Sequence, residues 1–385
     1  MTCFADFLII GGGVAGLSAA SRLVRHGRVV VLEAEDALGY HSSGRSVSFS
    51  HYGIGNEAVR GLTAWSRPFF EEPPAGFCPS PLARIVPSLY FATEETRPAL
   101  DALEAEMVRF TDRTRRVDAA AMTALCPALR TGDGGAVTGV LDPTGLKLDA
   151  DSLLQAFGRA VRGDGGEVLT GRRVEAIERQ GESWSLRAEG GGTWSAPVLV
   201  NAAGAWADRV AALAGVAPIG LLPMRRTVIV VDPPAGADIS AWPFAHSAAA
   251  DFYMLPEAGQ LLVSPVDEVA DDPCDAAPED YDVALAADRL EHYTHVGVTR
   301  IVHRWAGLRS FVADRVPTAG FDPVAPGFFW LVGQGGYGLQ TAPAMAAAVE
   351  ALVTGAPWPP GLAELGVLPG HVRAERLRSS HSPAT

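Results

Sequence analysis

The sequence lacks the features that mark a metal-binding or disulfide-bonded protein. Its four cysteines are scattered at positions 3, 78, 126 and 274, with no CxxC pair and no histidine at metal-ligand spacing. We therefore expect reduced thiols and no bound metal.

Long hydrophobic runs and excess positive charge are also missing. No apolar run approaches the roughly 18 residues that span a bilayer, and the chain enters its first strand without a basic flank or a small-residue cleavage site. The net charge of −13 repels nucleic acids and anionic lipid surfaces. We expect a cytoplasmic protein, monomeric or weakly homo-oligomeric, with a small-molecule substrate and no nucleic-acid partner.

The most informative segment that is present lies near the N-terminus. Unbroken apolar runs at 7–10 and 29–32 flank a helix-like stretch at 15–26, a pattern typical of buried parallel strands joined by a helix. Gly27 suits the left-handed position that often follows a helix. Hydrophobic residues make up 48% of the 385 residues, enough for a substantial core and two closely connected domains.

A glycine motif joins the first strand to the helix. Gly11 allows a tight turn, Gly13 lets backbone approach a pyrophosphate, and Gly16 lets the helix pack close to the sheet. A diphosphate would bind at the helix N-terminus. Glu33, at the end of the second run, has the position of a carboxylate that accepts hydrogen bonds from a ribose. The motif predicts a bound dinucleotide.

Later segments return to the same predicted sheet. Asp149 is a good N-cap for an apolar-periodic helix that leads into a strand at 167–169. Segment 198–204 reads as a buried strand that ends in small residues, and segment 328–338 reads as a strand running into a glycine-rich turn before a helix at about 341–352. If the ligand is a flavin, the positive end of that helix belongs near the pyrimidine carbonyl, which becomes negative on reduction.

An antiparallel second domain is predicted between these pieces. Segments 227–231 and 252–263 read as strands, the latter folded into a hairpin by a turn at 256–259. We interpret the acidic segment 267–282 as a solvated linker and helix start, with Pro278 near the first helical turn.

Taken together, these segments resemble the D-amino-acid oxidase (DAO) family of FAD enzymes, most closely the bacterial FAD-dependent D-arginine dehydrogenases. The resemblance spans essentially the whole chain. It is carried by the N-terminal motif with Glu33 and by His41–Ser46, Pro73–Cys78, Asp142–Gly145, Val200–Trp206, Trp305–Phe311 and Gln334–Gly338.

The resemblance implies an α/β fold in which a Rossmann-like FAD-binding domain carries an inserted antiparallel-sheet substrate domain. The implied FAD-binding domain comprises residues 1–48, 145–215 and 305–385, and the substrate-binding domain comprises 49–144 and 216–304. FAD is implied to bind noncovalently. Its implied contacts are Gly11, Gly13, Val14, Ala15, Gly16, Glu33, Ser43, Gly44, Arg45, Ser46, Val174, Ala202, Gly204, Trp206, Gly335, Gly336, Tyr337, Gly338 and Gln340.

The implied reaction is oxidation of a D-amino acid to an imino acid, which water hydrolyses to a 2-oxo acid and ammonia. Arg226 and Arg309 match the carboxylate-binding arginines of the family, and guanidinium groups suit this task because they form bidentate bonds. Tyr253 matches an assisting phenol, and the carbonyl of Gly336 matches an acceptor for the substrate amine.

The sequence departs from the family pattern at the substrate side chain. Ser88 stands where arginine-specific relatives carry a glutamate, and Phe49 and Ile54 stand where they carry a histidine and a lid tyrosine. His51 or Tyr52 could replace these groups after a small loop shift, although His51 could equally be an ordinary loop histidine. We expect a neutral pocket that prefers an uncharged or aromatic amino acid.

The electron acceptor is inferred from missing residues. Some oxidases that the chain resembles place a lysine over the flavin, and others attach the flavin to a cysteine. Lys147 is the only lysine and lies outside the Tyr253 hairpin, and no cysteine lies between Arg309 and Tyr337. We therefore favour a dehydrogenase that passes electrons to a quinone or another carrier.

Three alternatives remain open from the sequence. One is an oxygen-using oxidase of sarcosine, glycine or a cyclic imino acid. Another is a flavin-dependent 2-hydroxy-acid dehydrogenase, in which His51 would be the required base. The third is a non-catalytic FAD-binding subunit of a larger complex, which the altered loop at 49–54 would suit.

Overall fold

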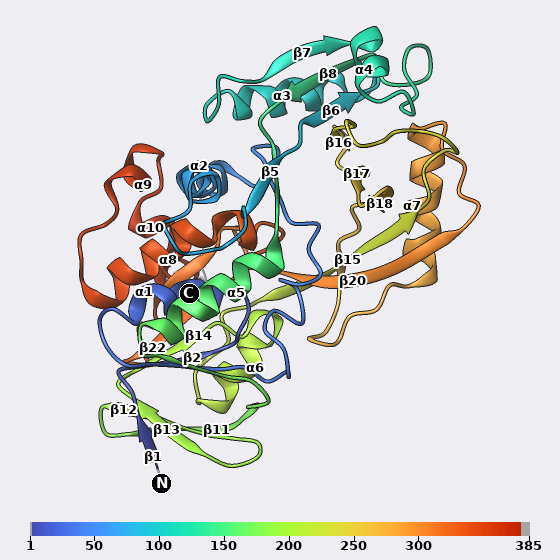
Figure 1. The fold of residues 1–385 in the computed structure, drawn as a ribbon. Helices are drawn as coiled ribbons and strands as arrows, with labels where there is room; N and C mark the ends of the chain where they lie inside the picture. The colour runs from blue at the N-terminus through green and yellow to red at the C-terminus, as the bar shows by residue number, and fades with distance from the viewer. Residues whose placement is uncertain (1, 379–385) are drawn as a thin grey trace, which may run out of the picture.

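The structure, a computed structural model, describes residues 2–378. Figure 1 shows two bodies: one holds the N-terminus and most of the helices, and the other lies at the upper right. Two long strands, β15 (Leu222–Val231) and β20 (Ile301–Phe311), run between the bodies and pair antiparallel along nearly their whole length.

The first body is built on a six-stranded sheet in which five strands are parallel and β21 is antiparallel. Its order is β10 (Glu167–Leu169), β3 (Val29–Leu32), β2 (Phe7–Ile10), β14 (Val198–Asn201), β22 (Phe328–Val332) and β21 (Thr318–Phe321). Strands β2 and β3 have the predicted bounds. Their apolar runs are unbroken because both faces of the sheet are covered.

Helices cover one face of this sheet and a second sheet covers the other. The helices are α1 (Val14–Leu23), α5 (Ala150–Gly163) and α8 (Gly338–Thr354), with α2 (Glu57–Glu71) packed on α8. The covering sheet has the order β1 (Thr2–Phe4), β13 (Thr193–Ala196), β12 (Ser183–Ala188) and β11 (Val174–Gln180). The short helices η1 (Gly204–Trp206), α6 (Ala207–Leu213), α9 (Pro360–Glu364), α10 (Pro369–Val372) and α11 (Glu375–Arg378) complete this body.

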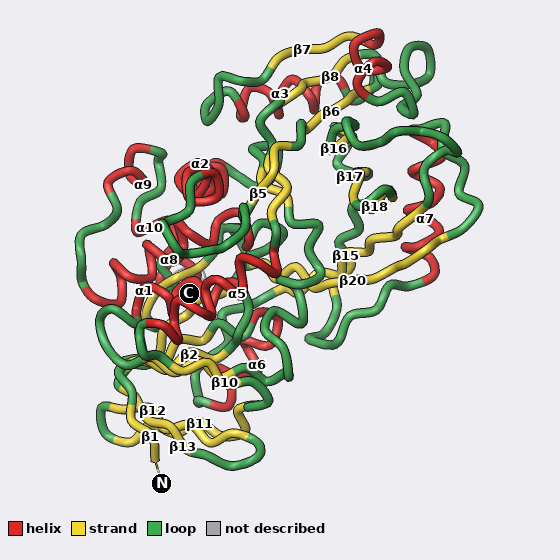
Figure 2. The backbone as a smooth tube through the Cα atoms, viewed as in Figure 1, coloured by secondary structure: helices red, strands yellow, loops and turns green. Residues whose placement is uncertain are grey.

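The second body is built on a nine-stranded sheet, which is antiparallel except where β16 and β6 pair in parallel. Besides β15 and β20 it contains β19 (Val269–Ala270), β18 (Gln260–Ser264), β17 (Tyr253–Glu257), β16 (Phe244–Ser247), β6 (Ser88–Ala92), β8 (Thr138–Asp142) and β7 (Arg115–Asp118). Helices α3 (Arg97–Met107), α4 (Ala119–Leu125) and α7 (Asp280–Tyr293) pack on it. Figure 2 shows these strands in yellow beside α7.

A small sheet of β4 (Phe49–Ser50), β9 (Leu146–Leu148) and β5 (Ala83–Ile85) lies at the junction of the two bodies. The fold class is therefore the predicted one: a Rossmann-like α/β body with an inserted, mainly antiparallel sheet. The domain boundaries stay a prediction, and the one expected between 304 and 305 falls inside the single strand β20.

Several local predictions were wrong in detail. The helix after the glycine motif ends at Leu23, three residues early, and Gly27 is not left-handed. A Cβ on Gly27 would lie 2.6 Å from the Asp6 carboxylate, which caps the backbone N–H of Arg28. In the hairpin, Pro256 still belongs to β17, so only two residues form the turn. Helix α8, expected at about 341–352, begins earlier, at Gly338.

The acidic segment 267–282 is not simply a solvated linker. Asp267 and Asp282 are buried, and each lies within ion-pair distance of a buried arginine, Arg226 and Arg225 respectively. Pro278 lies outside the helix, which begins at Asp280. Burial of these carboxylates depends on strand β15, about 50 residues earlier in the chain, so local composition could not reveal it.

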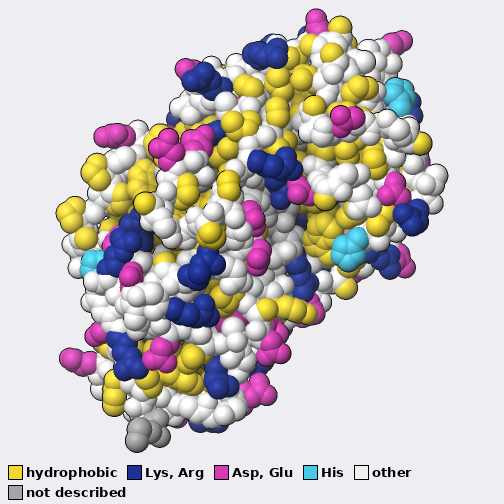
Figure 3. Space-filling view, viewed as in Figure 1, with side chains coloured by type: hydrophobic (Ala, Val, Ile, Leu, Met, Phe, Trp, Pro, Cys, Tyr) yellow, Lys and Arg dark blue, Asp and Glu magenta, His cyan; other side chains and the backbone are white. Residues whose placement is uncertain are grey.

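The surface carries both signs of charge. On the face shown in Figure 3, acidic and basic side chains are interspersed. Among residues 2–378, no helix is both long enough and apolar enough to cross a bilayer.

Candidate active site

Three adjoining cavities run from the glycine motif to the second body. The first lies beside Glu33, the second lies between the glycine motif and the Gln334–Gly338 turn, and the third, of about 800 Å³, opens into the second body. We call them the adenosine cavity, the flavin cavity and the substrate cavity. The adenosine and flavin cavities share Gly13, Ser42, Ser43, Ala202 and Gly204, and the flavin and substrate cavities share Ser46, Val47, Arg226, Tyr253, Arg309, Gly336 and Leu339.

The glycine motif has the close packing that a dinucleotide cradle requires. A Cβ on Gly16 would lie 2.0 Å from the carbonyl oxygen of Gly11, so the helix could not approach the turn with any larger residue. A Cβ on Gly13 meets only the Ser43 hydroxyl, at 3.3 Å, and would project toward the cavity. The space that Gly13 leaves open fits a pyrophosphate at the N-terminus of α1.

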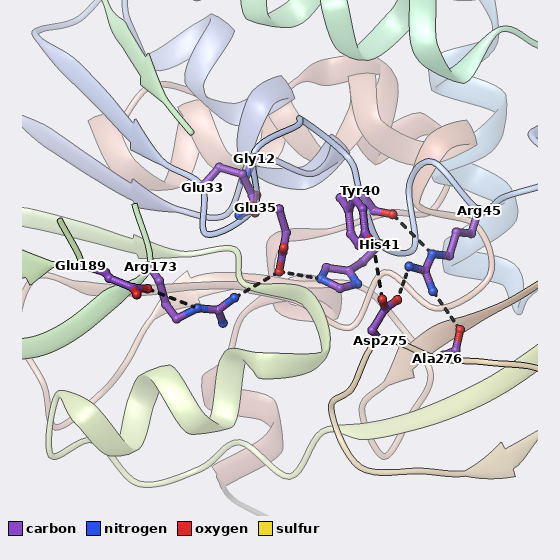
Figure 4. Close-up of polar contacts among 10 residues, drawn as sticks. All are labelled: Gly12, Glu33, Glu35, Tyr40, His41, Arg45, Arg173, Glu189, Asp275 and Ala276. Atoms are coloured by element: carbon purple, nitrogen blue, oxygen red, sulfur yellow. Dashed lines mark hydrogen bonds and ion pairs between the residues drawn. The ribbon is translucent and has the colours of Figure 1, made fainter. Parts of the chain in front are cut away.

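Glu33 lines the adenosine cavity, and its contact with a ribose stays a prediction. Its carboxylate accepts hydrogen bonds from the backbone N–H groups of Gly12, at 2.5 Å, and Glu35, at 2.9 Å. Figure 4 shows Glu33 against Gly12 at the turn. The carboxylate is thus held firmly while it lines the space available to a ribose.

The adenosine cavity has further polar residues that the sequence did not indicate. Glu35 pairs with His41 at 3.1 Å and with Arg173 at 3.2 Å (Figure 4), and the His41 ring packs on Trp206 with centroids 4.4 Å apart. Only Trp206 belonged to the predicted set. The sequence did contain a signal for His41, which begins one of the segments that resemble the family, but it contained none for Glu35 or Arg173.

Arg45 ties the two bodies together beside the flavin cavity. Its guanidinium is bonded to the Asp275 carboxylate and donates to the Ala276 carbonyl at 2.9 Å (Figure 4), while Trp305 donates to the Arg45 carbonyl at 2.8 Å. The neighbouring Gly44 supports the loop, because its N–H bonds the Gly39 carbonyl at 2.7 Å. Arg45 therefore fixes the loop as well as lining the cavity.

Most predicted cofactor residues line the first two cavities, and four do not. Gly16 and Gly44 lie behind the lining, and Tyr337 and Gln340 line the substrate cavity instead. The residues that line the adenosine or flavin cavity are Gly11, Gly13, Val14, Ala15, Glu33, Ser43, Arg45, Ser46, Val174, Ala202, Gly204, Trp206, Gly335, Gly336 and Gly338. The cradle, the placed carboxylate and the helix end near Gly338 fit FAD.

Arg226 and Arg309 come together through strand register. Arg226 pairs with Gly307 and Met224 pairs with Arg309, so the two arginines lie diagonally across β15 and β20 on one face of the sheet. Arg226 is buried, donates to the Asp267 carbonyl at 2.6 Å and lies 3.4 Å from Glu268. Burial, with the nearby charge of Arg309, lowers the pKa of Arg226 to about 9.

Two polar groups at this site have no partner. Within residues 2–378, the Arg309 guanidinium makes no hydrogen bond or ion pair, and the buried Tyr253 hydroxyl has no partner. Both side chains line the flavin and substrate cavities. Buried donors without partners are costly, so this cluster suits an anionic group such as a carboxylate.

The structure separates His51 from Tyr52. His51 lines the substrate cavity and its Nδ1 lies 2.5 Å from the Tyr90 hydroxyl. Burial, then the charges of Arg60 and Arg309, lowers the pKa of His51 to about 3. Tyr52 instead packs against Phe110 in another cluster, and it does not line the cavity. Tyr52 is therefore removed from the candidate catalytic residues.

Among the described residues, none that lines the substrate cavity offers an unpaired carboxylate to a cationic side chain. Ser88 is fully buried and does not line the cavity, whereas Phe49 and Ile54 do. The lining carboxylates, Glu268 and Asp314, are already paired with Arg315 and Arg376 respectively, each at 2.7 Å. The preference for an uncharged side chain stays a prediction.

Lys147 lies away from all three cavities. Its ammonium group lies 3.8 Å from Glu257, at the end of the Tyr253 hairpin, and donates to the Leu148 carbonyl. It therefore does contact the hairpin, but it does not line any of the three cavities.

Backbone strain is concentrated at the substrate cavity. Five residues other than glycine have positive φ between 2 and 378, and three of them, Ala250, Val266 and Arg315, line this cavity. For a β-branched residue such as Val266, at φ 54°, this conformation is costly. Strained backbone of this kind clusters at functional sites.

Comparison with known proteins identifies the family. The DAO family, described as FAD dependent oxidoreductase, matches residues 6–352. Glycerol-3-phosphate dehydrogenase 1 of Mycobacterium tuberculosis is 24% identical over 339 residues, covering 80% of this chain; the chain spans only 63% of that relative's length.

Solved structures share the whole architecture. L-proline dehydrogenase from P. horikoshii superposes with a TM-score of 0.82 at 18% identity, covering 99% of both chains. Glycine oxidase from Geobacillus kaustophilus gives a TM-score of 0.77 at 21% identity, covering 92% of this chain and 95% of that one. These likenesses show the fold, and the match to the family covers most of the sequence. The chain thus belongs to the DAO family of FAD-dependent oxidoreductases, and FAD is its cofactor.

Proposed function

We propose that this enzyme oxidises an uncharged D-amino acid to the imino acid, which water hydrolyses to the 2-oxo acid and ammonia. The observation that carries the proposal is the unpaired Arg309 guanidinium and Tyr253 hydroxyl beside Arg226, at the junction of the flavin and substrate cavities. The linings of the adenosine and flavin cavities would hold FAD, which would supply the hydride acceptor for this oxidation. The D configuration rests on the resemblance to the D-amino-acid oxidases.

The residues of this junction orient the substrate. Arg226 and Arg309 bind the carboxylate, and the Tyr253 hydroxyl donates a third hydrogen bond to it. The Gly336 carbonyl accepts a hydrogen bond from the substrate amine. With both ends of the amino acid held, Cα would be fixed in one orientation, and this positioning would supply much of the rate enhancement.

The side chain is uncharged in this proposal. The resemblance to D-arginine dehydrogenases would suggest D-arginine as the substrate. Its guanidinium would need an unpaired carboxylate in the cavity, and Glu268 and Asp314 are both paired. A cavity of about 800 Å³ is also far larger than glycine or sarcosine requires.

The hydroxy-acid alternative is disfavoured by His51. Removing a hydroxyl proton requires a base with a pKa near the working pH. His51 has a pKa of about 3 and its Nδ1 is engaged by Tyr90. The alternative of a non-catalytic FAD-binding subunit does not explain why Arg309 and Tyr253 line the cavity with unpaired polar groups.

Electrons pass in this proposal to a quinone or another carrier. Lys147 does not line the flavin cavity, and no cysteine lies between Arg309 and Tyr337. An oxygen-electrode and peroxide assay tests this point: we expect peroxide at a small fraction of the rate seen with an artificial quinone. Peroxide released at the full turnover rate would contradict it.

Anaerobic flavin reduction tests the reaction itself. The holoenzyme is mixed with D- and L-amino acids and with 2-hydroxy acids, and flavin absorbance is followed. We expect rapid bleaching by neutral D-amino acids, with Arg309→Met slowed at least about 100-fold at low substrate. Arg304→Met is the matched control, since Arg304 lies on the same strand and pairs with the exposed Asp280. Bleaching only by D-Arg and D-Lys, or by hydroxy acids alone, would contradict the proposal.

A further inference from the structure

A row of polar aromatic side chains crosses the floor of the substrate cavity. Tyr253 on β17 pairs with His246 on β16, and His246 pairs with Tyr90 on β6. Residues in register on neighbouring strands project from the same face of a sheet. The ring centroids are 5.7 Å apart for Tyr253 and His246, and 5.1 Å apart for His246 and Tyr90.

This row begins at the arginine pair and leads away from it. Tyr253 lines both the flavin and the substrate cavity, whereas His246 and Tyr90 line the substrate cavity alone. Adjacent strands lie about 4.8 Å apart, so Tyr90 lies two strand spacings, roughly 10 Å, from the Tyr253 end. A substrate group that reaches Tyr90 must therefore lie at the end of a long side chain.

The far end of the row can form hydrogen bonds with a ligand. Tyr90 and the His51 imidazole are joined by one hydrogen bond of 2.5 Å, which uses one donor and one acceptor of the pair. A neutral imidazole and a phenol together have two donors, so one donor and further acceptor sites remain. The Tyr90 hydroxyl also has the Ser88 side chain and the Gly53 backbone as hydrogen-bonding neighbours. Within the described chain, the buried Nε2 of His246 has no hydrogen-bond partner.

The row is also uncharged. Burial lowers the pKa of His246 well below its usual range, as it does for His51, and raises that of Tyr90. Arg60 and Asp142 act electrostatically on this end but do not line the cavity, so a charged side-chain terminus would meet no counter-charge in contact with it. A bare hydrocarbon ring would leave buried polar groups without partners. A hydroxyl, an indole N–H or an amide meets neither difficulty.

We propose that Tyr90, with His51 and His246, is the specificity-determining group that selects an uncharged substrate whose long side chain ends in a hydrogen-bonding group, such as a phenol. The inference rests on the proposed function, since it takes the arginine pair as the carboxylate anchor. It narrows the substrate class from uncharged amino acids to those with a polar group at the end of a planar or extended side chain.

Two carboxylic acids test this without turnover. 3-(4-Hydroxyphenyl)propanoate and 3-phenylpropanoate share the carboxylate and the ring, and differ only in the phenol. They lack the amine and cannot be oxidised, so their dissociation constants are read from the flavin absorbance of the oxidised holoenzyme. We expect the hydroxylated acid to bind roughly 3- to 10-fold more tightly, as one net hydrogen bond gives.

Substitution assigns the preference to a residue. Tyr90→Phe should abolish the difference between the two acids, while Tyr52→Phe, a matched control in a buried tyrosine outside the cavity, should retain it. Equal binding of the two acids to the wild-type enzyme, a preference that survives in Tyr90→Phe, or binding of neither acid would overturn the inference. Failure of every amino acid to reduce the flavin would overturn the proposed reaction, and the ratio of the two constants would still decide the inference.

Discussion

Gly336→Ala separates the stability of this protein from its activity. Gly336 is not among the residues with positive φ, so its backbone accepts an alanine. The added Cβ would lie 2.8 Å from Nη1 and 3.0 Å from Cζ of Arg309. Ordinary carbon contacts begin near 3.5 Å, so the guanidinium must move by on the order of 1 Å.

That movement should change the stability of the fold little and lower the reaction rate strongly. The group that yields is the end of a flexible side chain, so we expect a loss of stability of no more than about 1 kcal/mol. A displacement of about 1 Å in a substrate-positioning group can cost about 100-fold in rate. We therefore expect kcat/KM for the best amino acid to fall by roughly 100-fold while the melting temperature changes little.

The assay compares Gly336→Ala with Gly163→Ala. Gly163 ends helix α5, and a Cβ there meets no atom within 4 Å. Flavin content, thermal melting and steady-state kinetics are measured for both variants. If Gly336→Ala keeps its flavin and its kcat/KM stays within about threefold of the wild type, then Arg309 does not hold the carboxylate from its present position, and the reasoning is refuted.

Further predictions concern the cofactor and pH. Glu33→Gln should weaken FAD binding by about 10-fold or more, measured by quenching of FAD fluorescence, because hydrogen bonds to a charged group contribute about 1.5–3 kcal/mol; unchanged affinity would contradict its role. Gly16→Ala should yield protein without FAD, seen by absorbance, since the Cβ would meet backbone at 2.0 Å. Binding of 3-phenylpropanoate should weaken above about pH 9, because Arg226, with its pKa lowered to about 9, loses its charge as pH rises. Between pH 5 and 8 that binding should stay constant, since His51, with a pKa of about 3, remains neutral; an inflection near pH 6.5 would contradict this.

The parallel body could be predicted from the sequence because its signals are local. Strands Phe7–Ile10 and Val29–Leu32 are unbroken apolar runs, and the glycine motif between them has a fixed spacing. A strand buried on both faces is apolar at every position, so its own residues are enough to predict it. The arginine pair and Tyr253 were placed through the family resemblance, and strand register brings them to one place.

The second body could not be predicted to the same depth, because its important contacts join distant segments. His51 was identified as a candidate, but its partner Tyr90 is 39 residues later and its neighbour His246 lies on a strand that the sequence did not indicate. The sequence analysis treated Asp267 as solvated, because no residue close to it in the sequence indicates that Thr227 and Arg226 contact its carboxylate. Non-local pairing of this kind leaves no periodic trace in one sequence.

The row formed by Tyr253, His246 and Tyr90 also bears on how the substrate range of this enzyme could change. Tyr253 belongs to the carboxylate-binding group, but His246 and Tyr90 lie on two other strands, and either can be replaced without altering the register that holds Arg226 and Arg309 on β15 and β20. Replacement at one strand changes recognition at one depth of the cavity, in steps of about 4.8 Å. Selection, in nature or in the laboratory, could therefore lengthen or shorten the accepted side chain while the chemistry at Cα is inherited unchanged.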